Sequence, residues 1–322
     1  MSDAVARLKA QLPEHPSVDE LTPLAGDYTG LRILAVHAHP DDESSKGSAS
    51  AAAYTDRGAR YMVATMTGGE RGDILNEEIK HSPRAHRDLP GMRRSEMAAA
   101  AKAIGIEHRW MGFVDSGLPE GDPMPPLPFG CFGVQPLERA AAPLVRLVRE
   151  YRPHVMISYD EIGGYPHPDH IMSHKVAVEA YEKAGDPEAY VGEGQPWAPL
   201  KLYYDRAFNP ERLVAGHEFL MARDGQSVFS GWIENLVDQV STEGIRHEST
   251  TRIPSSAYFD RRDQAMLAHA SQIDPSGAFF AIPTEDVKKV WPWEDYTLIA
   301  SRVPVDLPEC CLADGLDYQA AG

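Results

Sequence analysis

The feature that most constrains how this chain can fold is an alternation of short apolar runs with helix-forming segments in its first half. Four apolar runs predict buried strands: LRILAVHA (31–38), RYMVATMT (60–67), EHRWMGF (107–113) and PHVMISYD (153–160). Helices are predicted between and after them, at 48–58, 92–105, 136–151 and 168–185, the third despite an internal proline. Strands that alternate with helices form parallel βαβ units. The pattern therefore predicts an α/β fold with a mostly parallel sheet sandwiched by helices.

The second half of the chain has a less regular pattern. It contains the stretches KLYYDRAF (201–208), QSVFSGWIENLVDQV (226–240) and YTLIASRVP (296–304), of which the second is amphipathic. We expect one domain over residues 1–322, with a core at about 31–184 and a C-terminal elaboration at about 185–322 that packs on the core. The first 30 residues lie outside these patterns and have no assigned role.

The charge of the chain argues against two classes of partner. Its formal net charge is −17, so both nucleic acid phosphates and anionic membrane surfaces would be repelled at long range. No apolar run approaches the length of about 18 residues that a membrane span needs, and the N-terminus lacks the apolar region of a signal peptide. Three cysteines form no disulfide framework. We expect a cytoplasmic enzyme that acts on a small molecule, and the sequence leaves a homo-oligomer open.

Polar clusters follow four of the predicted strands. HAHPDDE follows the first strand, GGERGD the second, VDSG the third and DEIGGYPHPDH the fourth. In an open α/β sheet, ligands bind outside the carboxyl ends of the parallel strands. All four clusters are therefore expected at one edge of the sheet, where together they can form a site.

Two of these clusters carry the residue types that hold a divalent metal. Zinc binds imidazole nitrogen and carboxylate oxygen, and a catalytic zinc site uses three protein ligands and one open position. His39 and Asp42 can face one ion across a tight turn, and His170 at the start of a later helix can supply a third ligand. Asp41 and His167 then remain free to act on water or substrate. The alternative is that each cluster is only a polar helix cap.

The motif AHPDDE after a strand, with HPDH at the start of a later helix, resembles the LmbE-like (PIG-L) family of zinc-dependent deacetylases and amidases. The longer stretches VHAHPDDESSKG, TGGERGDILN, GFVDSGLP, YDEIGGYPHPDH and AHASQIDP resemble its actinobacterial members that cleave mycothiol S-conjugates. The resemblance spans residues 36–275. It implies a Rossmann-like α/β sandwich and one Zn²⁺ per chain, with Fe²⁺ as the other candidate in the cell.

The resemblance also implies roles for individual residues. His39, Asp42 and His170 would hold the metal, and Asp41 would be the general base that activates water. Tyr165 and His167 would polarise the amide oxygen and assist departure of the amine. Positions that would contact the substrate are Lys46, Glu70, Arg93 and Asp115, with Arg71, His269 and Gln272 as further candidates near the pocket.

The activity implied is hydrolysis of the amide of a mycothiol S-conjugate, which releases a mercapturic acid and glucosaminyl-inositol. An alternative within the family is the deacetylase that makes glucosaminyl-inositol from its N-acetyl form. A non-haem iron oxygenase is an alternative of another class, because two histidines and a carboxylate also describe its metal site. A binding module with a structural zinc is a third, although three ligands and an open position argue for catalysis.

Overall fold

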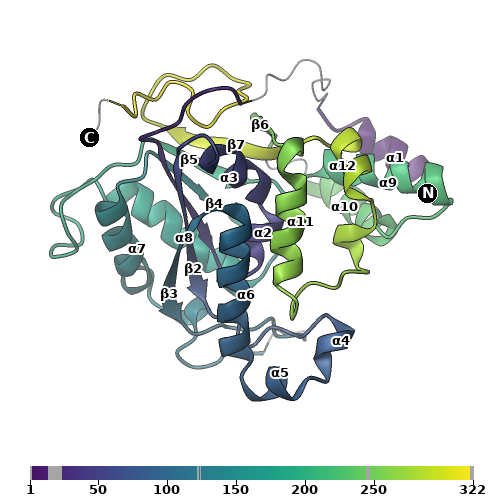
Figure 1. The fold of residues 1–322 in the computed structure, drawn as a ribbon, viewed down its shortest axis with the longest axis horizontal. Helices are drawn as coiled ribbons and strands as arrows, with labels where there is room; N and C mark the ends of the chain where they lie inside the picture. Colours follow the sequence, from purple (N-terminus) through teal and green to yellow (C-terminus); the bar gives the residue numbers. More distant parts are fainter. Residues whose placement is uncertain (1, 14–23, 122, 124, 244–246, 320–322) are drawn as a thin grey trace.

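A computed structural model describes residues 2–13, 24–121, 123, 125–243 and 247–319. Its centre is a seven-stranded sheet with the order β3-β2-β1-β4-β5-β7-β6 (Figure 1). The strands are β1 (Arg32–His37), β2 (Arg60–Thr67), β3 (Glu107–Phe113), β4 (Val155–Ser158), β5 (Lys201–Asp205), β6 (Thr251–Pro254) and β7 (Trp293–Ser301). β1 to β5 are parallel, and β7 pairs antiparallel with both β5 and β6. The expected mostly parallel sheet is confirmed.

Helices cover both faces of this sheet. The α-helices of the described residues are α1 (Ser2–Lys9), α2 (Asp42–Ser45), α3 (Ser48–Thr55), α4 (Glu77–Lys80), α5 (Pro83–Arg87), α6 (Leu89–Ile104), α7 (Leu137–Tyr151), α8 (Pro168–Lys183), α9 (Pro210–Asp224), α10 (Ser230–Glu243), α11 (Phe259–Ala268) and α12 (Thr284–Val290). α3, α6 and α11 lie on one face, and α7 and α8 on the other (Figure 1). α7 continues through Pro143, as the sequence predicts.

The residues of β1 show why its sequence is an unbroken apolar run. Ile33 and Ala35 belong to the core beneath α3, α6 and α11, whereas Leu34 and Val36 belong to the core beneath α7 and α8. Successive side chains of a strand point to opposite faces of the sheet, so a strand covered on both faces needs apolar residues at every position. The covered sheet therefore has two cores, one on each side.

The C-terminal half extends the sheet in addition to packing on it. β5, β7 and β6 continue the sheet beyond β4. α9 and α10 pack with the N-terminal helix α1, where Leu8 and Ile233 are fully buried in a third apolar cluster (Figure 1). The N-terminal segment, which had no assigned role, thus helps to bury the C-terminal helices. None of the helices in the described ranges is long and apolar enough to cross a membrane.

Candidate active site

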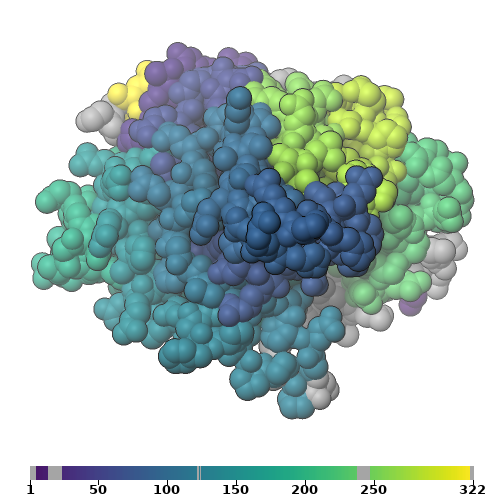
Figure 2. All heavy atoms as spheres, turned by 60° about the horizontal axis from the view of Figure 1, so that its bottom comes forward, coloured from purple at the N-terminus to yellow at the C-terminus, as the bar shows by residue number. Residues whose placement is uncertain are grey.

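The polar clusters meet where the direction of the chain's crossovers changes. β1 lies between β2 and β4, so the chain leaves β1 toward one side of the sheet and returns to form β4 on the other. Loops at such a switch point diverge and leave a crevice at the carboxyl ends of the strands. Figure 2 looks toward this edge, where the blue segment with α4 and α5 lies beside light green residues of the C-terminal half. A hydrogen bond from the Leu75 amide to the Ser271 carbonyl (3.1 Å) joins these two segments.

Asp42 is buried among the histidines at this edge of the sheet. Its Oδ2 atom is 3.6 Å from Nδ1 of His39 and 3.5 Å from Nε2 of His170. The same oxygen accepts hydrogen bonds from the His39 amide (2.9 Å) and the Tyr159 hydroxyl (2.7 Å), and Oδ1 contacts the ammonium of Lys46. Burial alone would raise the pKa of Asp42, but Lys46 and the two histidines hold it well below its usual range. Asp42 is therefore a fixed carboxylate between two imidazoles.

The hydrogen bonds of His170 leave one of its nitrogens ready to bind a metal. Its Nδ1 atom lies 2.9 Å from the Gly163 carbonyl, which can only accept, so Nδ1 carries the proton. Nε2 is buried and has no hydrogen-bond partner. Gly163 has φ of +76°, and a Cβ there would lie 2.4 Å from Cβ of His170, so glycine is needed for this close approach. A buried lone pair that faces Asp42 fits a metal ion.

His167 has the opposite tautomer. Its Nδ1 accepts a hydrogen bond from the Asp169 amide (3.1 Å), so in the neutral ring the proton is on Nε2. Ligand atoms of His39, His167 and His170 lie within 4.8 Å of one another, so all three histidines are close enough to share an ion. The tautomers separate their roles, because a ligand nitrogen must offer a lone pair and a proton donor must carry hydrogen.

Carboxylates around His39 make the site favourable for a cation. Nε2 of His39 is 3.2 Å from Asp169 and 3.7 Å from Asp115, and these three residues form a second group whose ligand atoms are within 4.8 Å. Burial lowers the pKa of His39, but the bonds to Asp115, Asp169 and Asp42 outweigh it and raise this pKa well above its usual value. A positive charge is therefore stabilised here, and a divalent ion would displace the imidazole proton.

Asp41 is held in an unusual conformation beside the histidines. Its φ is +123°, which residues other than glycine rarely adopt. Its amide donates to Oε2 of Glu43 (3.0 Å), which helps to fix the turn. Burial and the neighbouring charge of Asp42 raise the pKa of Asp41 to about 7. A carboxyl group with a raised pKa next to these histidines is suited to exchange protons with water near neutral pH.

The turn is braced from the C-terminal half of the chain. Nε2 of His269 lies 2.7 Å from Oε1 of Glu43, and both side chains are almost completely buried. The Gln272 amide group donates to the carbonyl of Pro40. We predicted both His269 and Gln272 near the pocket, and the structure gives them contacts with the HPDD loop. They support its backbone at Asp41.

We expect His269→Ala to lower the free energy of unfolding by about 1.5 to 3 kcal/mol, the usual value of a buried hydrogen bond to a charged group. In this variant Glu43 remains buried but loses the hydrogen bond to His269. The matched control is His247→Ala, which removes a His–Glu pair of similar length (2.8 Å) from Glu161, which is 51% exposed. That variant should lose less than about 1 kcal/mol. Equal losses in chemical unfolding of the two variants would contradict a bracing role for His269.

Three of the predicted substrate residues, Glu70, Arg93 and Asp115, already have hydrogen-bond partners within the protein. Glu70 accepts from the Asp115 amide (3.2 Å), while its Oε2 atom is buried without a partner. Arg93 is 1% exposed and donates to the carbonyls of Gly72 and Asp73. Asp115 accepts from the amides of Arg71 (2.9 Å) and Gly117 (2.7 Å). Their substrate contacts therefore stay predictions.

Tyr165 and Lys46 differ in how available they are. Tyr165 is 41% exposed, and its ring centre is 4.6 Å from that of His170. It lies over the histidine cluster with one side open to solvent. Lys46 is only 6% exposed and its ammonium contacts Asp42. A substrate group would have to share this ammonium with Asp42.

Sequence reasoning did not find three residues that support the site. Tyr159 donates to Asp42 and accepts from the Ala38 amide (2.8 Å). Asp169 accepts from both the amide (2.9 Å) and the hydroxyl of Ser116 and contacts His39. The only sequence signal was their position beside the histidine motifs and the VDSG stretch. Their roles depend on contacts between segments far apart in the chain.

The sequence matches a family model and several proteins of known name. Residues 34–181 match the family model described as PIG-L, GlcNAc-PI de-N-acetylase. A mycothiol S-conjugate amidase of Streptomyces coelicolor is 46% identical over 89% of this chain and 97% of its own length. A 1D-myo-inositol 2-acetamido-2-deoxy-alpha-D-glucopyranoside deacetylase of Streptomyces avermitilis is 37% identical over 85% of this chain and 93% of its own.

Among solved structures, the N,N'-diacetylchitobiose deacetylase of Pyrococcus horikoshii has a similar fold. Its TM-score is 0.55 at 15% identity, and the match covers 83% of each chain. The motifs HPDD and HPDH both fall within the residues that the family model matches. With a relative at 46% identity over nearly the whole chain, this protein belongs to the LmbE-like (PIG-L) family.

Proposed function

We propose that this protein is a zinc-dependent amidase that hydrolyses mycothiol S-conjugates to a mercapturic acid and glucosaminyl-inositol. The observation that carries a metal-dependent hydrolase is the buried, unpartnered Nε2 of His170 facing Asp42, with Asp41 on the adjoining turn. The 46% identity to an amidase that acts on such conjugates supports this substrate class. The three cysteines form no disulfide, which suits the reducing cytoplasm that we propose as its location.

His39, Asp42 and His170 would hold the metal, with one zinc per chain. Nitrogen and oxygen ligands with an open position suit Zn²⁺ and also admit Fe²⁺. When bound, the ion supplies a Lewis acid for the amide carbonyl and makes water more acidic. The relatives described above are an amidase and a deacetylase, which favours hydrolysis over the iron oxygenase alternative.

The remaining residues would move protons and position the amide. Asp41 accepts a proton from the attacking water, because its raised pKa matches neutral pH. His167 has its proton on Nε2, because Nδ1 accepts from the Asp169 amide. It would hydrogen-bond to the substrate and assist departure of the amine, and the proton that Asp41 took from water would pass to that amine. Tyr165 is exposed enough to reach the carbonyl oxygen with its hydroxyl. Glu70, Arg93 and Asp115 would contact the sugar and inositol hydroxyls.

Deacetylation of N-acetylglucosaminyl-inositol is the second candidate. It needs the same metal and the same base, and a relative with that name is 37% identical to this chain. The test is a side-by-side measurement of kcat/KM on an S-conjugate of mycothiol and on N-acetylglucosaminyl-inositol with the zinc-loaded enzyme. A preference for the conjugate is expected. A preference for the N-acetyl sugar would assign the protein to the deacetylases.

Lys46→Met should lower kcat/KM for conjugates by a factor that corresponds to about 1 to 3 kcal/mol of lost transition-state stabilisation. This is the usual value of a charged hydrogen bond, here to the cysteinyl part of the substrate. Methionine keeps the chain length but removes the ammonium. We expect a smaller loss on N-acetylglucosaminyl-inositol, which lacks the cysteinyl part and reports mainly the contact between Lys46 and Asp42. Equal losses on both substrates would assign Lys46 to Asp42 alone.

A further inference from the structure

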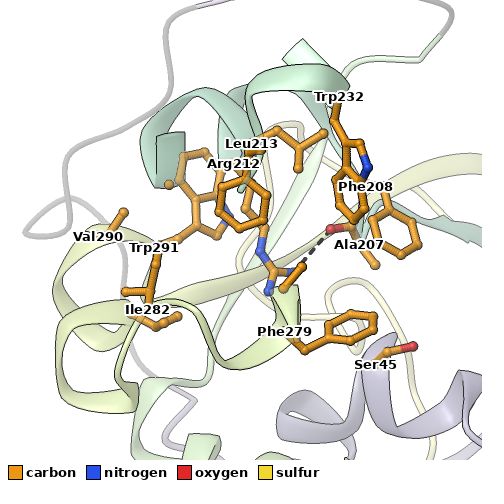
Figure 3. A pocket seen from close by; sticks show the side chains of 14 residues that line it. Ser45, Ala207, Phe208, Arg212, Leu213, Trp232, Phe279, Ile282, Val290 and Trp291 are labelled. Atoms are coloured by element: carbon orange, nitrogen blue, oxygen red, sulfur yellow. Dashed lines mark hydrogen bonds between the residues drawn. The ribbon is translucent and has the colours of Figure 1, made fainter. Parts of the chain in front are cut away.

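A cavity lies beside α2, the short helix at the end of the HPDD loop, and its lining is apolar where the proposed metal site is polar. It is an apolar cavity of about 90 Å³ between α9, α10, α12 and the segment 278–282. In Figure 3, Trp232 and Phe208 stand on one side, Val290 and Trp291 on the other, and Phe279 lies near Ser45. Except for Ser45, every lining residue comes from the chain after residue 206, outside the segment that the family model matches.

This cavity adjoins the proposed metal site through two consecutive residues. Ser45 lines the cavity, and the next residue, Lys46, contacts the proposed metal ligand Asp42. The Lys46 ammonium also lies 5.6 Å from the ring centre of Phe208, which is a wall of the cavity. The Lys46 ammonium therefore links Asp42 to the first aromatic ring of the cavity.

The lining favours an apolar occupant. Trp232 and Phe279 are 45% and 43% exposed although both are large and apolar. Ring contacts link Phe208 to Trp232 (6.3 Å between centres) and to Phe279 (6.5 Å). The guanidinium of Arg212, the one charged group of the lining, donates to the Ala207 carbonyl (3.2 Å). Exposed aromatic side chains gathered at a cavity indicate a ligand site, and an aromatic or alkyl group would cover them.

We propose that this cavity binds the apolar substituent on the sulfur of the thioether conjugate. The inference rests on the proposed function and deepens it. In such a substrate the sulfur is separated from the scissile carbonyl by the α- and β-carbons of the cysteinyl part, a span of roughly 4 Å. Lys46 contacts Asp42 and lies 5.6 Å from the ring centre of Phe208, so a substituent on that sulfur can extend from the proposed metal site toward the aromatic wall. Metal chemistry at the carbonyl does not require this cavity, so its effect is on the choice of substrate.

The experiment compares two conjugates that differ only in the substituent, S-benzyl and S-methyl mycothiol, on the zinc-loaded enzyme. Phe279→Ala removes part of the wall, and Ala278→Leu fills the space. Both variants should lower the ratio of kcat/KM for S-benzyl over S-methyl by about 10-fold, the discrimination usual for a small change in an apolar pocket. Leu267→Ala is the control, because Leu267 is similarly exposed (46%) and does not line the cavity. Its ratio should equal that of the unchanged protein.

The outcomes separate this proposal from the proposed function. If the unchanged protein hydrolyses both conjugates and the two cavity variants keep its ratio, the pocket assignment is wrong and the amidase stands. If the unchanged protein hydrolyses N-acetylglucosaminyl-inositol and neither conjugate, the proposed function is wrong and the pocket assignment falls with it. Metal content and thermal midpoint, measured on each variant, ensure that only folded, zinc-loaded enzyme enters the comparison.

Discussion

His170→Gln is expected to lower the affinity for zinc by more than about 100-fold, beyond the loss that follows when only a supporting contact of a ligand is removed. The reason is that Nε2 of His170 is buried, has no partner and faces Asp42. Hydrolysis should fall to the level of the metal-free protein. Metal per folded chain after dialysis, measured by mass spectrometry, checks the first result independently of activity.

His174→Gln is the matched control for this variant. His174 lies one helical turn further along α8, is also buried, and bonds through Nδ1 to the Tyr159 carbonyl (3.0 Å). It should keep a full equivalent of metal. Retention of tightly bound metal by His170→Gln, or its loss in His174→Gln alone, would show that the ligand set is wrong. Chelation of the unchanged protein should abolish hydrolysis, and added zinc should restore it.

Asp41→Asn is expected to keep its metal and to lose roughly 10²- to 10⁴-fold in kcat, the usual contribution of a general base. Asparagine is preferable to alanine at this position because it tolerates a positive φ better than most residues, and φ of Asp41 is +123°. The turn should therefore remain while the proton acceptor is lost. Single-turnover rates on a conjugate, with metal content measured on the same sample, give both quantities.

Asp42→Asn tests the other half of the assignment. It should lose metal, because Asp42 contributes the negative charge between the two imidazoles. A metal-free Asp41→Asn together with a metal-loaded Asp42→Asn would reverse the two roles. Loss of metal in both would mean that Asp41 also ligates.

The choice between the two candidate substrates must depend on residues outside the proposed metal site. Both candidate reactions would use the same proposed metal and base, because each would hydrolyse an amide. Discrimination must come from residues that meet the rest of the acyl group. Lys46 and the apolar cavity beside it are the residues to which we assign these contacts.

The parallel core and the sheet edge at which the site lies follow from local sequence patterns. β1, β2 and β4 are buried on both faces, so their sequences are apolar at nearly every position and are recognisable without tertiary information. The polar clusters had to converge because carboxyl ends of parallel strands share one edge. HPDD and HPDH follow β1 and β4, which are neighbours in the sheet. Local pattern and strand direction were enough for these conclusions.

The residues that support the proposed metal site and the helices that surround the apolar cavity are evident only from tertiary contacts. Glu43 and His269 are 226 positions apart, and Ser116 and Asp169 are 53 apart, so no local pattern relates them. Asp169 at the start of α8 has the sequence of a helix-terminal residue, and its contact with His39 depends on how α8 packs. α9 and α12 were not predicted, since their apolar faces pack against one another and against α10 and α11 rather than on the sheet. Contacts between distant segments form only when the chain folds, because burial of apolar surface and paired charges stabilises them jointly.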